Sequence, residues 1–146
     1  MVFIIFLDDD ILVDDRYMRS EIEKCSKFLY GMIHARFILT VPGMSKMLKK
    51  YENADYGCCP RTLCESQKLL PVGLSDIPGE SSVKLFCALC KDVYEPKNNR
   101  TKGTDGAFFG TTFPHLFLKT FSDTVTTPFK AYNPRIFGFK LCKGFL

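Results

Sequence analysis

Apolar residues recur at helical spacing in the first third of the chain. They fall every three or four positions between Tyr17 and Phe37, and Asp14 and Asp15 precede the run, where helix-capping residues are expected. We therefore predict a long amphipathic helix over this stretch. Cys25 lies on its apolar stripe, and because a free cysteine packs as a small hydrophobic side chain, we expect Cys25 to be a buried core residue.

A second, shorter helix is predicted after the Pro42-Gly43 pair, which interrupts the first pattern. Its apolar residues are again spaced by three or four, and the lysines between them would form its exposed face. The apolar set is Met44, Met47, Leu48 and Tyr51, and the lysines are Lys46, Lys49 and Lys50. We assign residues 1–54 to an acidic N-terminus and a helical subdomain.

The composition of the chain changes from Asp55 onward: glycine and proline become frequent, and the apolar runs become short. Residues 69–73 and 83–87 have the composition of short strands, so a small antiparallel sheet is predicted within residues 55–112. In the last segment, residues 113–146, an aromatic stretch at 113–118 predicts one or two helical turns. Residues 135–140 are interpreted as an extended arm that exposes its phenylalanines.

Four cysteines form two closely spaced pairs inside the middle segment. Cys59 and Cys64 are separated by four residues, and Cys87 and Cys90 by two. Thiolates are soft ligands, and four of them converging from two turns make the closed tetrahedral site that structural Zn2+ occupies. On spacing alone, Cys58 could replace Cys59. The predicted fold is therefore α+β: a helical subdomain, a zinc ribbon with a small antiparallel sheet, and an extended C-terminal arm.

The competing interpretation of the cysteines is a disulfide framework. The chain has seven cysteines, an odd number that cannot pair completely. Residues 1–7 are apolar, but no basic region precedes them and Asp8 ends the run, so we predict neither a secretory signal nor a membrane span, which needs about 20 apolar residues. We expect an intracellular protein in a reducing compartment, where thiols bind metal.

The net charge of +4 hides an asymmetry along the chain. The first 15 residues hold five aspartates and no base: Asp8, Asp9, Asp10, Asp14 and Asp15. Residues 97–146 contain eight lysines and arginines but only two acidic residues. The basic C-terminal part would suit an acidic partner, although a solvated surface explains it equally well.

Signatures of catalysis are missing from the sequence, which has no P-loop, no GxGxxG and no GxSxG. His34 lies within the first predicted helix, where we expect a hydrogen-bonded structural role. His115 follows a proline in an aromatic run and is interpreted as a packed or surface residue. The residue chemistry therefore predicts an interaction protein and not an enzyme.

Five strings of residues resemble the casein kinase II regulatory (beta) subunit family. They are YGMIHARFILT (30–40), GCCPR (57–61), LPVGLSDIPGE (70–80), TDGAFFG (104–110) and RIFGFK (135–140), in order across roughly residues 20–142. The resemblance implies a non-catalytic protein that dimerises through its zinc ribbon and holds two catalytic kinase subunits in a heterotetramer. It would stabilise those subunits and modulate the choice among protein substrates. Relative to the family pattern, we expect an N-terminally shortened member, located in the cytoplasm and nucleus.

The resemblance also implies roles for particular residues. By matched position the zinc ligands are Cys59, Cys64, Cys87 and Cys90. The dimer contacts are the apolar residues beside the cysteine turns, namely Pro60, Leu63, Val93 and Tyr94. The kinase-docking residues are Arg135, Ile136, Phe137, Gly138, Phe139 and Lys140, with the two phenylalanines as aromatic anchors. More loosely, the five N-terminal aspartates resemble the family's acidic loop, which attracts polyamines and basic substrate regions.

A zinc-ribbon protein that binds nucleic acid in the transcription machinery is the alternative. It would require a basic face on the ribbon itself. Residues 55–95 carry four bases and six acids, so the ribbon is not basic and no specific nucleic-acid partner is predicted.

Overall fold

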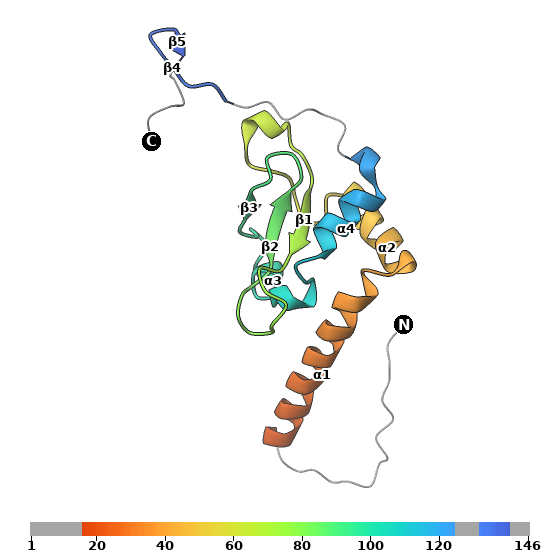
Figure 1. Ribbon diagram of the computed structural model, residues 1–146. Coiled ribbons are helices and arrows are strands. Elements are labelled where there is room, and N and C mark those ends of the chain that lie inside the picture. The colour runs from red at the N-terminus through yellow and green to blue at the C-terminus, as the bar shows by residue number, and fades with distance from the viewer. Residues whose placement is uncertain (1–15, 125–131, 141–146) are drawn as a thin grey trace.

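The computed structural model describes residues 16–124 and 132–140. Helices and small antiparallel sheets build an α+β fold, which confirms the predicted class (Figure 1). The N-terminal part contains α1 (Arg16–Phe37) and α2 (Val41–Glu52). The middle part contains η1 (Thr62–Cys64), β1 (Leu69–Val72), β2 (Lys84–Cys87), β3 (Val93–Tyr94), α3 (Asn99–Lys102) and η2 (Gly106–Phe108), where η denotes a 3-10 turn. The chain continues through α4 (Phe113–Thr120) and η3 (Ser122–Thr124) to β4 (Arg135–Ile136) and β5 (Phe139–Lys140).

Helix α1 has the predicted length, but most of its apolar stripe is exposed. Met18, Ile22, Phe28, Leu29 and Ile33 all lie on the surface. Cys25 is exposed as well, so its predicted place in the core is wrong. The reason is that helical periodicity tells which residues share a face, whereas burial depends on a second element to cover that face. In the described ranges, the element with which α1 packs most extensively is the short turn η2.

The contact between α1 and η2 is tight and specific. Gly31 lies against the ring of Phe108, and a Cβ at this position would lie 2.3 Å from a ring carbon. His34 Nδ1 lies 2.8 Å from the carbonyl oxygen of Phe108, so this histidine has the hydrogen-bonded structural role that was predicted. The His34 ring also meets the ring of Phe109 edge-on, with centroids 5.1 Å apart. The absence of a side chain at Gly31 is what lets the helix approach this turn.

Helix α2 begins one residue before the proline that was expected to separate the two helices. Thr40 is its N-cap, and the Thr40 hydroxyl accepts a hydrogen bond from the Gly43 amide at 3.3 Å. Pro42 falls in the first turn, where its missing N–H would have had no helical partner and its fixed φ favours the helix. The three lysines at positions 46, 49 and 50 are exposed, as predicted.

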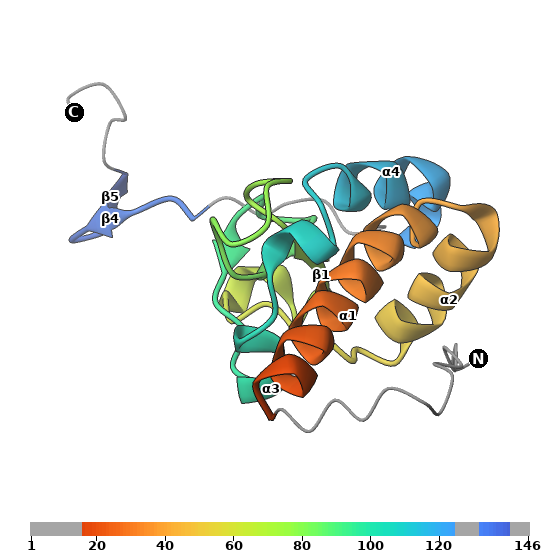
Figure 2. The ribbon, with the colours of Figure 1, turned by 90° about the horizontal axis from the view of Figure 1, so that it is seen from below.

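Two hydrophobic clusters fill the interior of the described part of the chain. The first joins α2, α4 and β1, and consists of Ile38, Met44, Met47, Tyr51, Leu70, Phe113 and Phe117. Tyr51 and Phe117 pack with ring centroids 5.4 Å apart, and α2 and α4 accordingly lie side by side (Figure 2). The second cluster surrounds the cysteines and consists of Cys59, Cys64, Leu69, Leu85, Cys87 and Leu89. The half-buried Tyr56 packs against both clusters and connects them.

The three central strands form an antiparallel sheet in the order β1-β2-β3. Leu69 pairs with Cys87, and Phe86 pairs with Val93. All four residues of β1 are buried: Leu70 belongs to the first cluster, on the side where α4 lies against the strand, and Leu69 belongs to the second (Figure 1). No helix within residues 16–124 and 132–140 has the length and apolar content needed to cross a bilayer.

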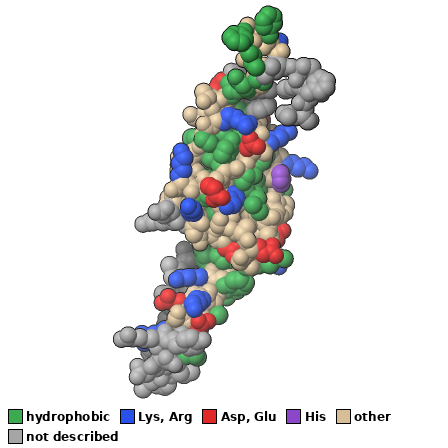
Figure 3. Space-filling view, turned by 90° about the vertical axis from the view of Figure 1, so that its left-hand side faces the viewer, with side chains coloured by type: hydrophobic (Ala, Val, Ile, Leu, Met, Phe, Trp, Pro, Cys, Tyr) green, Lys and Arg blue, Asp and Glu red, His purple; other side chains and the backbone are tan. Residues whose placement is uncertain are grey.

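The arm at residues 135–140, which was interpreted from the sequence as extended, is a two-stranded hairpin. Arg135 pairs with Lys140 and Ile136 with Phe139. Gly138 sits in the left-handed region at φ 86°, as does Phe137 at φ 48°. Positive φ at both central residues is the requirement of a type I′ turn, which twists in the same sense as the strands it joins. Figure 3 shows hydrophobic side chains gathered at this protruding end of the molecule.

Candidate metal centre

The first cysteine pair is held by a short hydrogen-bonded loop around η1. The Cys59 amide donates to the Gln67 carbonyl at 2.7 Å, and the Gln67 amide donates to the Cys64 carbonyl at 2.9 Å. After Cys64 the chain reverses through Glu65 and Ser66, which both adopt left-handed backbone conformations at φ 49° and 59°. These bonds fold the loop so that both sulfurs face the same side.

The second pair is held by the end of β2 and the turn that follows it. The Cys87 amide donates to the Asp92 carbonyl at 3.0 Å, and the Lys91 amide donates to the Cys87 carbonyl at 2.9 Å. Lys91, the residue after Cys90, is left-handed at φ 60°. In both loops, therefore, a left-handed residue directly follows the second cysteine of the pair.

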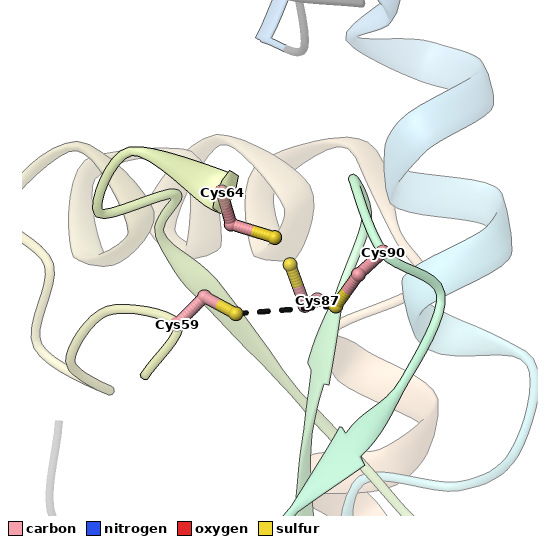
Figure 4. Close-up of side chains that lie close together, drawn as sticks. All are labelled: Cys59, Cys64, Cys87 and Cys90. Carbon is pink, nitrogen blue, oxygen red and sulfur yellow. Dashed lines mark hydrogen bonds between the residues drawn. The ribbon is translucent and has the colours of Figure 1, made fainter. Parts of the chain in front are cut away.

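The structure brings the four predicted cysteines together. The Sγ atoms of Cys59, Cys64, Cys87 and Cys90 all lie within 4.8 Å of one another. Three of these residues are buried and Cys90 is half-buried, and their sulfurs point into a common centre (Figure 4). The sulfurs of Cys59 and Cys90 are 3.9 Å apart, far longer than the roughly 2.05 Å of a disulfide. Four converging soft donors make this a candidate site for a metal ion.

Cys58 takes no part in this cluster. Its side chain is exposed, and its backbone forms a bridge with Lys68. Spacing alone could not choose between Cys58 and Cys59, and the fold places Cys59 inside. Among the described residues, the six cysteines are free, while Cys142 lies outside the described ranges.

Burial strongly affects the protonation of the clustered thiols. It raises the pKa of the Cys87 thiol to about 11, and it raises the pKa of Cys64 as well, because a buried thiolate loses its hydration. Burial acts in the same direction on Cys90, but hydrogen bonds from the Tyr94 hydroxyl and the Asp92 backbone outweigh it and lower the Cys90 pKa to about 7. At neutral pH a metal ion must therefore displace protons from Cys64 and Cys87 in order to bind.

Tyr94 has a contact with this site that the sequence did not reveal. Its Oη atom lies 3.2 Å from Cys90 Sγ and 3.5 Å from Cys59 Sγ. These contacts raise the pKa of the phenol above its ordinary value, because the neighbouring sulfurs disfavour a phenolate. In the sequence, Tyr94 is visible only as an aromatic residue four positions after Cys90, and the family resemblance implied a dimer contact for it.

The other predicted dimer contacts lie around the same two loops. Pro60 and Val93 are exposed, and Leu63 is half-buried. Arg61 and Asp92 form an ion pair at 2.9 Å that links the first loop to the second. Both charges are substantially exposed and screened by solvent, so this pair orients the loops more than it stabilises them.

The remaining predicted residues lie away from the cysteines. Every residue of the predicted docking segment, 135–140, is exposed in the β4–β5 hairpin. The five aspartates of the predicted acidic patch, Asp8, Asp9, Asp10, Asp14 and Asp15, lie outside the described residues.

Comparison with known proteins finds one family along nearly the whole chain. The family described as casein kinase II regulatory subunit matches residues 3–140. Casein kinase II subunit beta' of Saccharomyces cerevisiae is 53% identical over 139 residues, which cover 94% of this chain and 54% of the yeast protein. Casein kinase II subunit beta of Schizosaccharomyces pombe is 51% identical over 125 residues, 85% of this chain and 54% of the relative. Casein kinase II subunit beta-3 of Arabidopsis thaliana is 50% identical over 137 residues, which cover 93% of this chain and 49% of the plant protein. The chain thus spans about half the length of the curated relatives it matches.

Proposed function

The chain belongs to the casein kinase II regulatory subunit family, and from that premise we propose that it is a non-catalytic regulator of this Ser/Thr protein kinase. In this proposal it forms a homodimer, docks and stabilises catalytic subunits, and modulates the choice among protein substrates. The observation that carries the proposal is the family match itself, which runs through both the cysteine cluster and the exposed hairpin.

We propose Zn2+ as the metal of the cysteine cluster. A tetrahedral site with zinc–sulfur bonds of about 2.3 Å places its sulfurs about 3.8 Å apart, and the 3.9 Å between Cys59 and Cys90 is close to that separation. Four cysteines leave no coordination position for water or substrate, so the role of the ion would be structural. Binding energies of about 10–16 kcal/mol, typical of small zinc modules at neutral pH, would decide whether the loops are folded.

The proposed dimer contact lies beside the two cysteine loops. Val93 is 45% exposed and stands with the exposed Pro60 and the half-buried Leu63 at this end of the ribbon. An apolar surface beside a small metal-folded core gains stability when a second copy covers it. We expect Val93→Asp to dissociate the dimer in sedimentation experiments while the protein keeps its zinc. Val41→Asp, which also changes an exposed valine, is the matched control and should leave the dimer intact.

The proposed docking element for the catalytic subunit is the β4–β5 hairpin. Phe137 is 97% exposed and Phe139 is 79% exposed, so both rings are available to a partner. Burying one phenylalanine side chain stabilises by about 1.5–3 kcal/mol, and two neighbouring aromatic anchors can dominate a small interface.

Calorimetric titration of the zinc-loaded chain with a casein kinase II catalytic subunit tests the proposed function. We expect binding that saturates at one catalytic subunit per chain. A folded, zinc-loaded dimer that binds no catalytic subunit would contradict the proposal.

A further inference from the structure

The Tyr94 hydroxyl contacts two of the four clustered sulfurs, those of Cys90 and Cys59. We propose that Tyr94 is a positioning residue of the metal centre, whose hydroxyl donates a hydrogen bond to the Cys90 thiolate and thereby slows loss of the metal. This inference rests on the zinc site proposed above and assigns Tyr94 a role besides that of a dimer contact.

The sheet register places the hydroxyl where it can act. Tyr94 on β3 pairs with Leu85 on β2, and side chains of directly paired residues point to the same face of a sheet. Cys87 follows two residues after Leu85 on the same strand, so it points to that face as well. Leu85 and Cys87 are buried members of the cysteine cluster, and the Tyr94 ring packs against it. The position of Oη is therefore fixed by backbone pairing.

The direction of the hydrogen bond follows from the number of hydrogens available. In the thiol form, Cys59 Sγ donates to Tyr94 Oη at 3.5 Å. When cysteines bind a metal they do so as thiolates, which accept hydrogen bonds but cannot donate them. The only hydrogen left between the three atoms is then the one on Oη. It is directed to Cys90, because that sulfur is the nearer acceptor, at 3.2 Å.

Cys90 is the ligand that has most need of such a bond. Four thiolates around a divalent cation carry a net charge of −2, so a donor pointing at one sulfur neutralises part of an excess negative charge. Cys59, Cys64 and Cys87 are buried, whereas Cys90 is half-buried and is therefore the most exposed of the four ligand residues. Hydrogen bonds from outside the ligand set change metal affinity by about 10- to 100-fold where they have been removed.

Tyr94→Phe tests this role, because it removes the hydroxyl and keeps the ring that packs on the cluster. The matched control is Tyr56→Phe: the Tyr56 ring packs against the same cluster, but its hydroxyl contacts Met47 Sδ at 4.0 Å and none of the four clustered cysteines. The full-length proteins are loaded with zinc, their fold is checked by circular dichroism, and zinc transfer to a chromogenic chelator is timed. Alkylated cysteines are then mapped by mass spectrometry during the transfer.

We expect Tyr94→Phe to release zinc about 10- to 100-fold faster than the parent, with Cys90 the first of the four clustered cysteines to be alkylated, and Tyr56→Phe to behave as the parent. Sedimentation should show the same dimer for all three proteins, which separates the hydroxyl from any loss of dimer contact. Parental release kinetics and an unchanged order of alkylation in Tyr94→Phe would overturn the inference alone, leaving the zinc site in place. A parent that binds no zinc would overturn both the zinc proposal and the inference.

Discussion

Replacing Phe137 by asparagine separates two properties that this residue combines at the tip of the hairpin. Phe137 presents an exposed ring, and its backbone is left-handed at φ 48°, ahead of Gly138 at φ 86°. Asparagine followed by glycine is the preferred pair for a type I′ turn. Phe137→Asn therefore favours the turn while it removes the ring, whereas Phe137→Ala removes the ring and keeps an unfavourable backbone.

The structure sets the size of the two effects. Because Phe137 is 97% exposed, nearly the whole ring is available for burial against a partner, and its loss costs about 1.5–3 kcal/mol of binding free energy. That free energy corresponds to binding that is about 10- to 150-fold weaker. A left-handed conformation costs an ordinary L-residue about 1–2 kcal/mol, and asparagine removes part of this cost. If it regains about 1 kcal/mol by populating the turn before binding, Phe137→Asn remains about 2- to 30-fold weaker than the parent.

Titration calorimetry with a casein kinase II catalytic subunit measures these differences. We expect the affinity to decrease in the order parent, Phe137→Asn, Phe137→Ala, with an unchanged dimer. Val41→Ala is the control, because Val41 is 83% exposed and lies on α2, away from the hairpin. If Phe137→Asn bound as tightly as the parent or more tightly, the turn and not the ring would be the recognised feature, and the anchor hypothesis would be refuted.

Four further perturbations test the fold and the metal centre. Gly31→Ala would ordinarily stabilise a helix by about 1 kcal/mol. Here the new Cβ would lie 2.3–2.5 Å from three Phe108 ring carbons, so we expect the substitution to lower the free energy of unfolding and the urea midpoint. A higher midpoint would contradict the α1–η2 contact. Lys91→Gly should raise the thermal midpoint of the zinc-loaded protein by a few degrees, because glycine tolerates φ 60° where lysine is strained; a decrease would count against this reasoning. Burial raises the Cys87 pKa to about 11, so protons compete with the metal for this thiolate throughout the neutral and acid range, and chelators should extract zinc faster as pH falls. Cys87→Ser removes the ligand, and we expect this variant to bind no zinc. Zinc retention that did not depend on pH between 7 and about 5 would argue against thiolate ligation.

Local sequence signals predicted those parts of the fold that local chemistry determines. The spacing of Met44, Met47 and Tyr51 predicted α2, whose buried face contains these residues. Both predicted central strands formed, because short runs of apolar residues between glycines and prolines suit a small sheet. The cysteine pairs converge because two tight turns, each with its own backbone hydrogen bonds, can be recognised from spacing within a few residues.

Features that depend on distant partners were missed. The apolar stripe of α1 predicted a buried Cys25, but a stripe does not say which element will cover it. The Tyr94 hydroxyl reaches the cysteines through pairing between β3 and β2, which no local pattern encodes. The pairing of β4 with β5 is local, but it too was missed, because phenylalanine is an unusual residue for a left-handed position and does not indicate a hairpin turn.

The ring of Tyr56, shared by the two interior clusters, has a consequence for how the molecule unfolds. Two direct bonds reinforce this junction: Gln67 Nε2 donates to Tyr51 Oη at 2.6 Å, and Lys68 Nζ donates to the Glu52 carbonyl at 2.7 Å. Both run from α2 to the segment that closes the first cysteine loop. Amide hydrogen exchange in α2 should therefore accelerate when zinc is withdrawn, although no residue of α2 is a ligand. Metal binding would then determine the free energy of local unfolding for α2 as well as for the cysteine loops. The amides of both parts would exchange with solvent as one cooperative unit.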